Sequence, residues 1–274
     1  MNWIKKHLMT MILVLIFLAG LGLLLYPTVS DYWNSFHQSR AVVSYIESVT
    51  NIDDKKYEEL WNSAVAYNKE LAETGIKWTL TDEEKEEYDE YLKVDDTGIM
   101  AYIEIPEIDC SLPVYHGTEE SVLQIAIGHI EGTSFPVGGE GSHCVLSGHR
   151  GLPSAKLFTD LDKLVEGDTF ILQTLDATLT YEVDQIRIVE PTDLSDLQIE
   201  EGKDYCTLVT CTPYGINTHR LLVRGHRIAN DEEAIEVRVS ADATQIDPIQ
   251  VAPFIAAPIL LILLFLLFFG GRKK

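Results

Sequence analysis

Basic residues are scarce in this sequence. Only 21 of its 274 residues are Lys or Arg, whereas 43 are Asp or Glu. All of the acidic residues lie between Asp31 and Gln250, and five of the basic ones lie outside that region, which leaves it a net charge of −27. A surface of this sign repels phosphate backbones. We therefore exclude nucleic acid as a partner.

Cysteine is also sparse, and no pair has the Cys-x-x-Cys spacing of a zinc or redox site. The four cysteines are Cys110, Cys144, Cys206 and Cys211. They are spread over a long domain that does not need disulfides to fold, so a free reactive thiol is allowed. The sequence shows no internal repeat and no cluster of carboxylates that suits a metal. We expect neither a metal ion nor another cofactor.

Polar residues are almost absent from two long runs. From Leu8 to Tyr26 only Thr10 is polar, and from Val251 to Phe269 no residue is. Each run approaches the roughly 20 residues that a membrane-spanning helix needs. A cleaved signal peptide is the alternative for the first run, but Tyr26-Pro27-Thr28 offers no small-x-small cleavage site. The sequence predicts two transmembrane helices.

Positive charge lies at the outer end of both runs and sets the expected orientation. Positively charged loops stay in the cytoplasm, so both termini are expected there and the region between the runs on the extracellular face of the plasma membrane. The residues concerned are Lys5, Lys6, Arg272, Lys273 and Lys274.

The chain divides into five segments by composition. We expect a cytoplasmic tip and first membrane helix over residues 1–30, an extracellular helical segment over 31–93, and the main domain over 94–229. An acidic stalk is expected over 230–250, followed by a second membrane helix with a basic tail over 251–274.

The segment before the main domain has two helix patterns. Apolar residues recur at helical spacing from Asp53 to Gly75, where Asp can cap the start and Gly the end. Thr81-Asp82-Glu83-Glu84 has the form of a capping box, which predicts a second helix towards Leu92. Trp78 lies in the short connector between them and must pack on another part of the protein.

After Lys93 the pattern becomes one of short apolar strands separated by Gly, Pro and Asp. Short helical pieces are expected near Ser121–Ile127 and Ser154–Leu157. Many strands without long alternating helices favour a mainly β fold, a closed or nearly closed barrel of antiparallel type. The clearest predicted strands are Met100–Ile105, His143–Leu146, Thr169–Gln173, Thr178–Val189, Tyr205–Cys211 and Arg220–Arg227.

Cys211 is the candidate nucleophile. It is the last residue of a predicted strand that breaks at Thr212-Pro213-Tyr214-Gly215, so it lies at the rim of the barrel. Strand alternation puts Val209 on its face and Thr210 on the opposite one. Because an ordinary thiol is mostly protonated at neutral pH, a catalytic one needs a base or a cation beside it.

Arg220 and a histidine are candidates for these partners. Arg220 begins the next strand, where the intervening turn folds it back beside Cys211 and its charge can stabilise an oxyanion. His149 follows a predicted strand at a glycine-rich corner, and His143 lies on the same strand with the same parity. Spacing alone leaves the choice between these two histidines open.

Three segments resemble the signatures of sortases, the cysteine transpeptidases of Gram-positive cell surfaces. Thr207-Leu208-Val209-Thr210-Cys211 is similar to their Thr-Leu-x-Thr-Cys motif. Leu146-Ser147-Gly148-His149-Arg150-Gly151 resembles their histidine segment, and His219-Arg220-Leu221-Leu222-Val223 their arginine segment. The resemblance covers Val94 to Arg227 and implies that His149, Cys211 and Arg220 are catalytic, with Thr210 in a supporting role.

The C-terminal span and the N-terminal helical extension resemble class C sortases, which polymerise pilins. This resemblance implies cleavage of a Leu-Pro-x-Thr-Gly-like sorting signal between Thr and Gly through a thioester on Cys211. The acyl group would pass to an amine, either a pilin lysine or a peptidoglycan cross-bridge. The expected partners are thus pilin or surface-protein sorting signals and the amine acceptor.

One feature of class C is missing, since no Asp-Pro-aromatic lid motif precedes the expected barrel. Trp78 lies where that lid would be. Our hypothesis is that its ring covers the mouth at Cys211 and that Asp82 faces Arg220. The alternative is that Trp78 is an ordinary hydrophobic anchor for the helices.

Other functions fit the sequence less well. A cysteine phosphatase needs Cys-x5-Arg, whereas Cys211 and Arg220 are nine residues apart with Pro213 between them. A surface adhesin would explain the membrane anchors but leaves the Cys, His and Arg residues without a purpose. A purely hydrolytic cysteine peptidase is the closest alternative.

Overall fold

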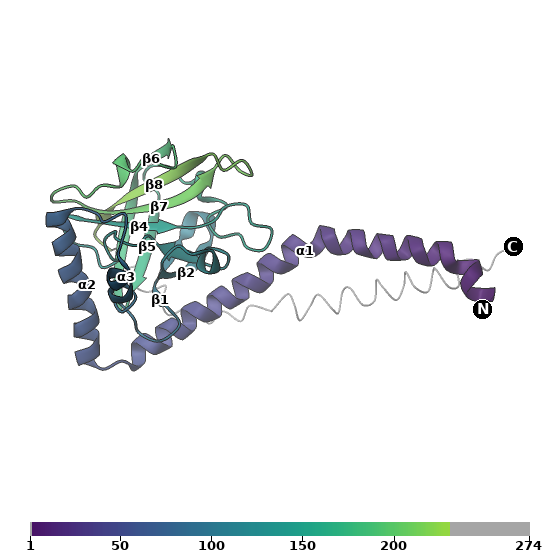
Figure 1. Cartoon of the computed structure of the whole chain (residues 1–274), viewed down its shortest axis with the longest axis horizontal. Helices are drawn as coiled ribbons and strands as arrows, with labels where there is room; N and C mark the ends of the chain where they lie inside the picture. The colour runs from purple at the N-terminus through teal and green to yellow at the C-terminus, as the bar shows by residue number, and fades with distance from the viewer. Residues whose placement is uncertain (1, 231–274) are drawn as a thin grey trace. The chain divides into compact units, whose positions relative to one another are not determined.

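Eight strands close into a barrel in the computed structural model, which describes residues 2–230 (Figure 1). Around the barrel the strands follow the order β1-β2-β3-β4-β7-β8-β6-β5, and β5 pairs with β1. This confirms the predicted closed, mainly β architecture. The strands are β1 Ile99–Ile105, β2 Cys110–His116, β3 Ile127–His129, β4 Ser142–Ser147, β5 Thr169–Thr174, β6 Ala177–Val189, β7 Asp204–Thr212 and β8 His219–Ile228.

Two neighbouring pairs in the barrel are parallel, β2 with β3 and β4 with β7. The prediction of antiparallel type is therefore correct only for the other pairs. A parallel pair needs a long crossover, and the chain between β4 and β7 forms β5 and β6 on the way. The parallel pairing brings the carboxyl ends of β4 and β7 to the same rim of the barrel.

All six predicted strands are present, but β2 and β3 were not predicted. Pro113 interrupts the pattern of β2, because proline within a run argues against a strand. β3 has only three residues, Ile127–His129, too few for a periodic signal. The predicted helical piece Ser121–Ile127 is α4, Glu120–Leu123, which ends before Ile127 begins β3.

The predicted helix at Ser154–Leu157 is wrong, because this segment forms a bend and a turn and contains no helix. Its backbone binds side chains of the N-terminal helix instead. The Asn34 amide donates to the Ser154 carbonyl at 2.6 Å, and the Lys156 amide donates to the Asp31 carboxylate at 2.6 Å. Tertiary hydrogen bonds thus replace those of a helix.

The two helices predicted before the barrel are confirmed. α2, Asp54–Thr74, is capped by the side chain of Asp53, and Gly75 ends it with a φ of 82° that favours glycine. α3, Asp82–Tyr88, begins with the predicted capping box and ends before Leu92. Short 3₁₀ helices are η1 Pro106–Ile108, η2 Leu161–Lys163 and η3 Ser195–Leu197.

A single helix, α1, runs from Asn2 to Asn51 with Pro27 inside it. Its stretch His7–Asn51 is the one helix among residues 2–230 that is long and apolar enough to cross a membrane. It contains the first of the two predicted spans, whereas the predicted stalk and C-terminal span lie outside the described residues.

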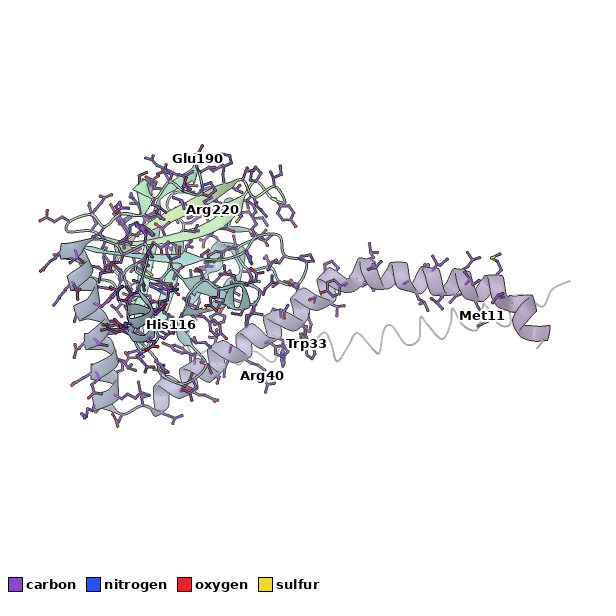
Figure 2. The ribbon with its side chains drawn as sticks, viewed as in Figure 1. Met11, Trp33, Arg40, His116, Glu190 and Arg220 are labelled. Carbon is purple, nitrogen blue, oxygen red and sulfur yellow. The ribbon has the colours of Figure 1, made fainter. Side chains whose placement is uncertain are left out.

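The part of α1 after Pro27 packs on the barrel (Figure 1). Tyr45 is buried and its hydroxyl donates to the Met100 carbonyl of β1 at 2.9 Å. On the opposite side of the helix, Trp33 and Arg40 project away from the barrel (Figure 2).

The buried side chains form two clusters on opposite faces of β4, β7 and β8. The large one fills the barrel and includes Leu146 and Leu208. The small one consists of Val145, Leu197, Val209 and Leu222. Because neighbours along a strand face opposite sides, this second set, here called the outer cluster, lies on the outside of the barrel wall.

Candidate active site

Strand β7 lies between β4 and β8, and this arrangement builds the candidate site. In the β7–β8 ladder Cys211 is directly opposite Arg220. In the β4–β7 ladder Ser147 is opposite Val209, and the Gly148 amide donates to the Val209 carbonyl at 3.0 Å. This ladder ends at the Ser147–Val209 pair, and His149 follows two residues later in the loop that leaves the rim where β7 carries Cys211.

Cys211 and Arg220 share a face of the barrel wall, and His149 follows the strand on the other side of β7. Residues directly opposite in a ladder point to the same side, and Cys211 has the parity of Val209, which belongs to the outer cluster. We call His149, Cys211 and Arg220 the Cys211 row. The row lies at the rim of the barrel, and the apolar outer cluster lies next to it along the strands.

The side chains of Cys211 and Arg220 are open to chemistry. Cys211 is a free, partly exposed thiol. The Arg220 guanidinium donates to the carbonyls of Asn217 at 3.4 Å and His219 at 3.1 Å, both in the hairpin turn. Within residues 2–230 no carboxylate forms an ion pair with the Arg220 guanidinium (Figure 2 labels this residue), so its positive charge is not neutralised there.

His149 is held at the start of the loop that follows β4. Its side chain is 28% exposed, and its Nε2 lies 3.7 Å from the carboxylate of Glu120 on α4. The Phe158 amide donates to the His149 carbonyl at 3.1 Å. Gly148 is required before it, because a Cβ there would lie 2.5 Å from a methyl carbon of Ile127. Sequence reasoning did not find Glu120, since no motif marks it.

Thr210 faces the opposite side from Cys211, as its parity predicts. It is buried, and its hydroxyl donates to the Gly148 carbonyl at 2.8 Å. This bond joins the end of β7 to the residue directly before His149. The structure thus gives Thr210 a contact that fixes the relative position of the two segments of the Cys211 row.

His143 lies at the other end of the ladder. It is opposite Tyr205, six residues before Cys211, which corresponds to roughly 20 Å along a strand. Its ring nitrogens contact the Gln198 carbonyl at 2.8 Å and the Thr207 hydroxyl at 2.7 Å. Burial lowers the pKa of His143, so the ring is neutral at pH 7. The structure therefore places His143 far from Cys211 along the ladder, whereas His149 follows the end of β4 at the rim where Cys211 lies.

Four further contacts hold the loops around the site and were not predicted. Asp31 and Asn34 of α1 bind the loop after His149, as described above, and the Gln38 amide donates to the Ile125 carbonyl beside α4 at 2.7 Å. The Arg150 guanidinium lies 5.8 Å from the ring centre of Tyr214 in the β7–β8 turn. Helix α1 and the hairpin turn thus support the two segments that flank His149.

Trp78 packs against the outer cluster and not inside the barrel. The neighbouring Lys77 amide donates to the Gly132 carbonyl at 3.2 Å, which fixes the connector to the loop after β3. The packing of Trp78 on the outer cluster is the contact expected of a hydrophobic anchor. Asp82 is exposed, and no ion pair joins it to Arg220 in the part of the chain that the structure describes. The lid hypothesis stays a prediction.

The described residues also include no group of three or more His, Cys, Asp or Glu side chains placed to hold a metal ion. The chemistry of the Cys211 row is instead that of a nucleophile, a proton carrier and a fixed cation. Such a set can attack a carbonyl, stabilise the oxyanion and protonate a leaving amine.

Comparisons with known proteins agree with this chemistry. A family model described as a sortase domain matches residues 103–228. The crystal structure of sortase C1 from Streptococcus agalactiae is 57% identical, with a TM-score of 0.69, and covers 70% of this chain and 100% of that one. A Clostridium perfringens sortase C structure with the C-terminal cell wall sorting motif is 43% identical, with a TM-score of 0.62, over 70% of this chain and 100% of that one.

A more distant relative matches over a shorter stretch. Sortase D of Bacillus subtilis is 31% identical over 129 residues, which are 46% of this chain and 62% of that relative. The chain thus matches less than two thirds of its length.

Proposed function

Because this chain belongs to the sortase family of cysteine transpeptidases, we propose that it joins pilin subunits through their sorting signals. The substrate would be a Leu-Pro-x-Thr-Gly-like peptide, cut between Thr and Gly, and the acceptor a lysine amine of another pilin. The observation that supports this proposal is the pairing of β7, because Arg220 of β8 lies opposite Cys211 and β4 on the other side leads into the loop that begins with His149.

The first half of the proposed reaction forms a thioester. The Cys211 thiolate attacks the Thr carbonyl carbon, and the Arg220 guanidinium stabilises the negative oxygen that results. His149 then gives a proton to the glycine nitrogen, the C–N bond breaks, and the glycine end leaves as a neutral amine. The partly exposed thiol and the unpaired guanidinium at the rim are suited to these roles.

In the second half an amine replaces the sulfur. His149, now neutral, takes a proton from the incoming lysine amine, which attacks the thioester carbonyl and releases the Cys211 thiolate. The product is an isopeptide bond between two chains. Thr210 is a positioning residue in this scheme, because its hydroxyl fixes Gly148 and hence the place of His149.

Support for pilin as substrate comes from the similar structures. The C. perfringens structure contains a sorting motif, and the structure of Streptococcus pneumoniae sortase C is described in terms of pilin substrate specificity. Sortases are membrane-associated, and α1 contains a candidate span. We further propose that both termini are cytoplasmic and the barrel extracellular. Anchoring of surface proteins to peptidoglycan is the alternative acceptor chemistry.

The test uses the full chain in detergent with a sorting-signal peptide, with and without a lysine-bearing acceptor peptide. Mass spectrometry should show the ligated product when the amine is present, and Cys211→Ala should abolish it. Cys110→Ala is the matched control, because this cysteine lies on β2 away from the Cys211 row, and it should retain ligation. Hydrolysis that is equally fast with and without the amine would identify a peptidase instead.

We also keep the proposal that Trp78 is a lid over Cys211, with Asp82 facing Arg220. In its support, the ring packs on the outer cluster directly beneath the Cys211 row. Trp78→Ala is expected to increase the rate at which a thiol reagent modifies Cys211. An unchanged rate would leave Trp78 as an anchor for the connector alone.

A further inference from the structure

Two cysteines that the proposed reaction does not use lie side by side inside the barrel. Cys144 of β4 and Cys206 of β7 are directly opposite in the parallel ladder. They are 2% and 0% exposed, and both are free thiols. Figure 1 shows β4 and β7 as neighbours in the barrel wall. Both side chains have the interior parity of Leu146 and Leu208, so they face away from Cys211.

The two thiols influence each other's ionisation. Burial by itself raises the pKa of the Cys144 thiol, but hydrogen bonds with Cys206 and His129 lower it to about 6. Burial and the bond to Cys144 raise the pKa of Cys206 well above its usual range.

The backbone allows these sulfurs to bond. Neighbouring strands are about 4.8 Å apart, within the range of roughly 4.4–6.8 Å between Cα atoms that disulfides require. On the other side of Cys206 in the sheet stands Gly225, which has no side chain. No third side chain in the ladder row separates the two sulfurs.

We propose that Cys144 and Cys206 are a site of disulfide formation, a covalent cross-link between the two strands that carry His149 and Cys211. The spacing gives this link a consequence for the site. Cys144 precedes His149 by five residues, and Cys206 precedes Cys211 by five residues. A bond at this row holds β4 and β7 in the register that brings the loop with His149 to the rim where Cys211 lies.

The oxidant is a disulfide of a small thiol, such as oxidised glutathione. The Cys144 thiolate attacks one sulfur of the oxidant and releases one glutathione thiolate. Cys206 then loses its S–H proton and attacks the Cys144 sulfur, and the second glutathione leaves as a thiolate. The pair gives up two electrons and two protons in all. Because the folded barrel buries both thiols, the reaction takes place while the barrel is open or not yet folded.

The test incubates the reduced full chain in detergent with oxidised glutathione near the onset of thermal unfolding. Free thiols are then alkylated in denaturant, followed by mild reduction of mixed disulfides and non-reducing peptide mapping. We expect the chain to lose the mass of two hydrogen atoms, and peptides containing Cys144 and Cys206 to be joined. The midpoint of thermal unfolding should rise by up to about 10 °C, because the bond closes a loop of some 60 residues in the unfolded chain.

Variants separate this site from other thiol chemistry. Cys144→Ala and Cys206→Ala should each abolish the bridge and the thermal shift, whereas Cys110→Ser should keep both. The proposal would be overturned if all four cysteines were still alkylated after oxidation. It would also be overturned if disulfides of Cys110 or Cys211 formed as often as the Cys144–Cys206 disulfide. These readouts do not depend on transpeptidation, so failure of the proposed function would leave them unchanged.

Discussion

The hydroxyl of Thr210 offers the sharpest test of how the site is held together. Thr210→Val replaces the hydroxyl with a methyl group of nearly the same size. The Gly148 carbonyl, which now accepts at 2.8 Å inside the protein, would lose its donor. A buried group left without its partner costs about 1–3 kcal/mol. The segment can recover this energy only by moving, and His149 is the next residue.

The size of the effect on rate follows from this cost. If misplacement of His149 raises the activation free energy by about 2 kcal/mol, the rate of thioester formation falls roughly 30-fold, since each 1.36 kcal/mol is a factor of ten in rate. The assay is single-turnover acylation of the full chain by a saturating sorting-signal peptide. Alkylation of Cys211 by a small neutral reagent should change much less, because the thiol itself is not moved.

The matched control lies on the same strand. The Thr207 hydroxyl contacts His143 at 2.7 Å, and Thr207 is also buried. Thr207→Val should lower stability by a similar amount without slowing acylation, and Thr210→Ser should restore it. Equal losses of acylation in Thr210→Val and Thr207→Val would refute the reasoning, because the effect would then be general loosening of β7.

Three further predictions concern the charge at the rim, the membrane helix and pH. Arg220→Lys should slow acylation roughly 100-fold, the typical effect of losing one oxyanion donor, whereas Arg187→Lys on β6 should not; equal rates would exclude Arg220 from the reaction. Asn34→Ala removes the bond from α1 to Ser154, worth about 1 kcal/mol, and should slow acylation about 5-fold in the full chain, whereas Ser35→Ala, whose hydroxyl bonds only within α1, should not. Burial lowers the pKa of His143 in the folded protein, so the unfolded chain binds a proton on this histidine at a higher pH than the folded protein does. The free energy of unfolding therefore keeps the full contribution of His143 above about pH 6.5. Below that pH it falls by up to about 1.4 kcal/mol per pH unit. When the free energy of unfolding in urea is plotted against pH, it should fall less steeply below pH 6.5 for His143→Gln than for His219→Gln, whose histidine is exposed. Identical slopes of the two plots would contradict the lowered pKa of His143.

The sequence predicted the barrel because its strands carry the apolar pattern and its turns carry Gly, Pro and Asp. The parallel pairing of β4 with β7 was not predictable, since both strands have the same pattern in either direction. That pairing is what places His149 and Cys211 at one rim, so spacing alone could not choose between His149 and His143. The resemblance to sortases made that choice, which stays a prediction.

Contacts between distant segments are the part that local pattern does not encode. Asn34 and Ser154 are 120 residues apart, and neither has a motif. Their bond replaced the predicted helix at Ser154–Leu157. Glu120 faces His149 only because α4 packs beside the loop after β4. Cys144 and Cys206, by contrast, were noted in the sequence only as cysteines without Cys-x-x-Cys spacing, and the strand register makes them a pair.

The central claim is that Cys211 becomes acylated with the help of His149 and Arg220. Its most direct test is the intact mass of the full chain mixed with a sorting-signal peptide, followed by peptide mapping of the adduct. The account predicts a thioester on Cys211 in the wild type, none in Cys211→Ala, and a greatly slowed adduct in Arg220→Lys. Product formed without any adduct on Cys211, or an adduct on another residue, would contradict it.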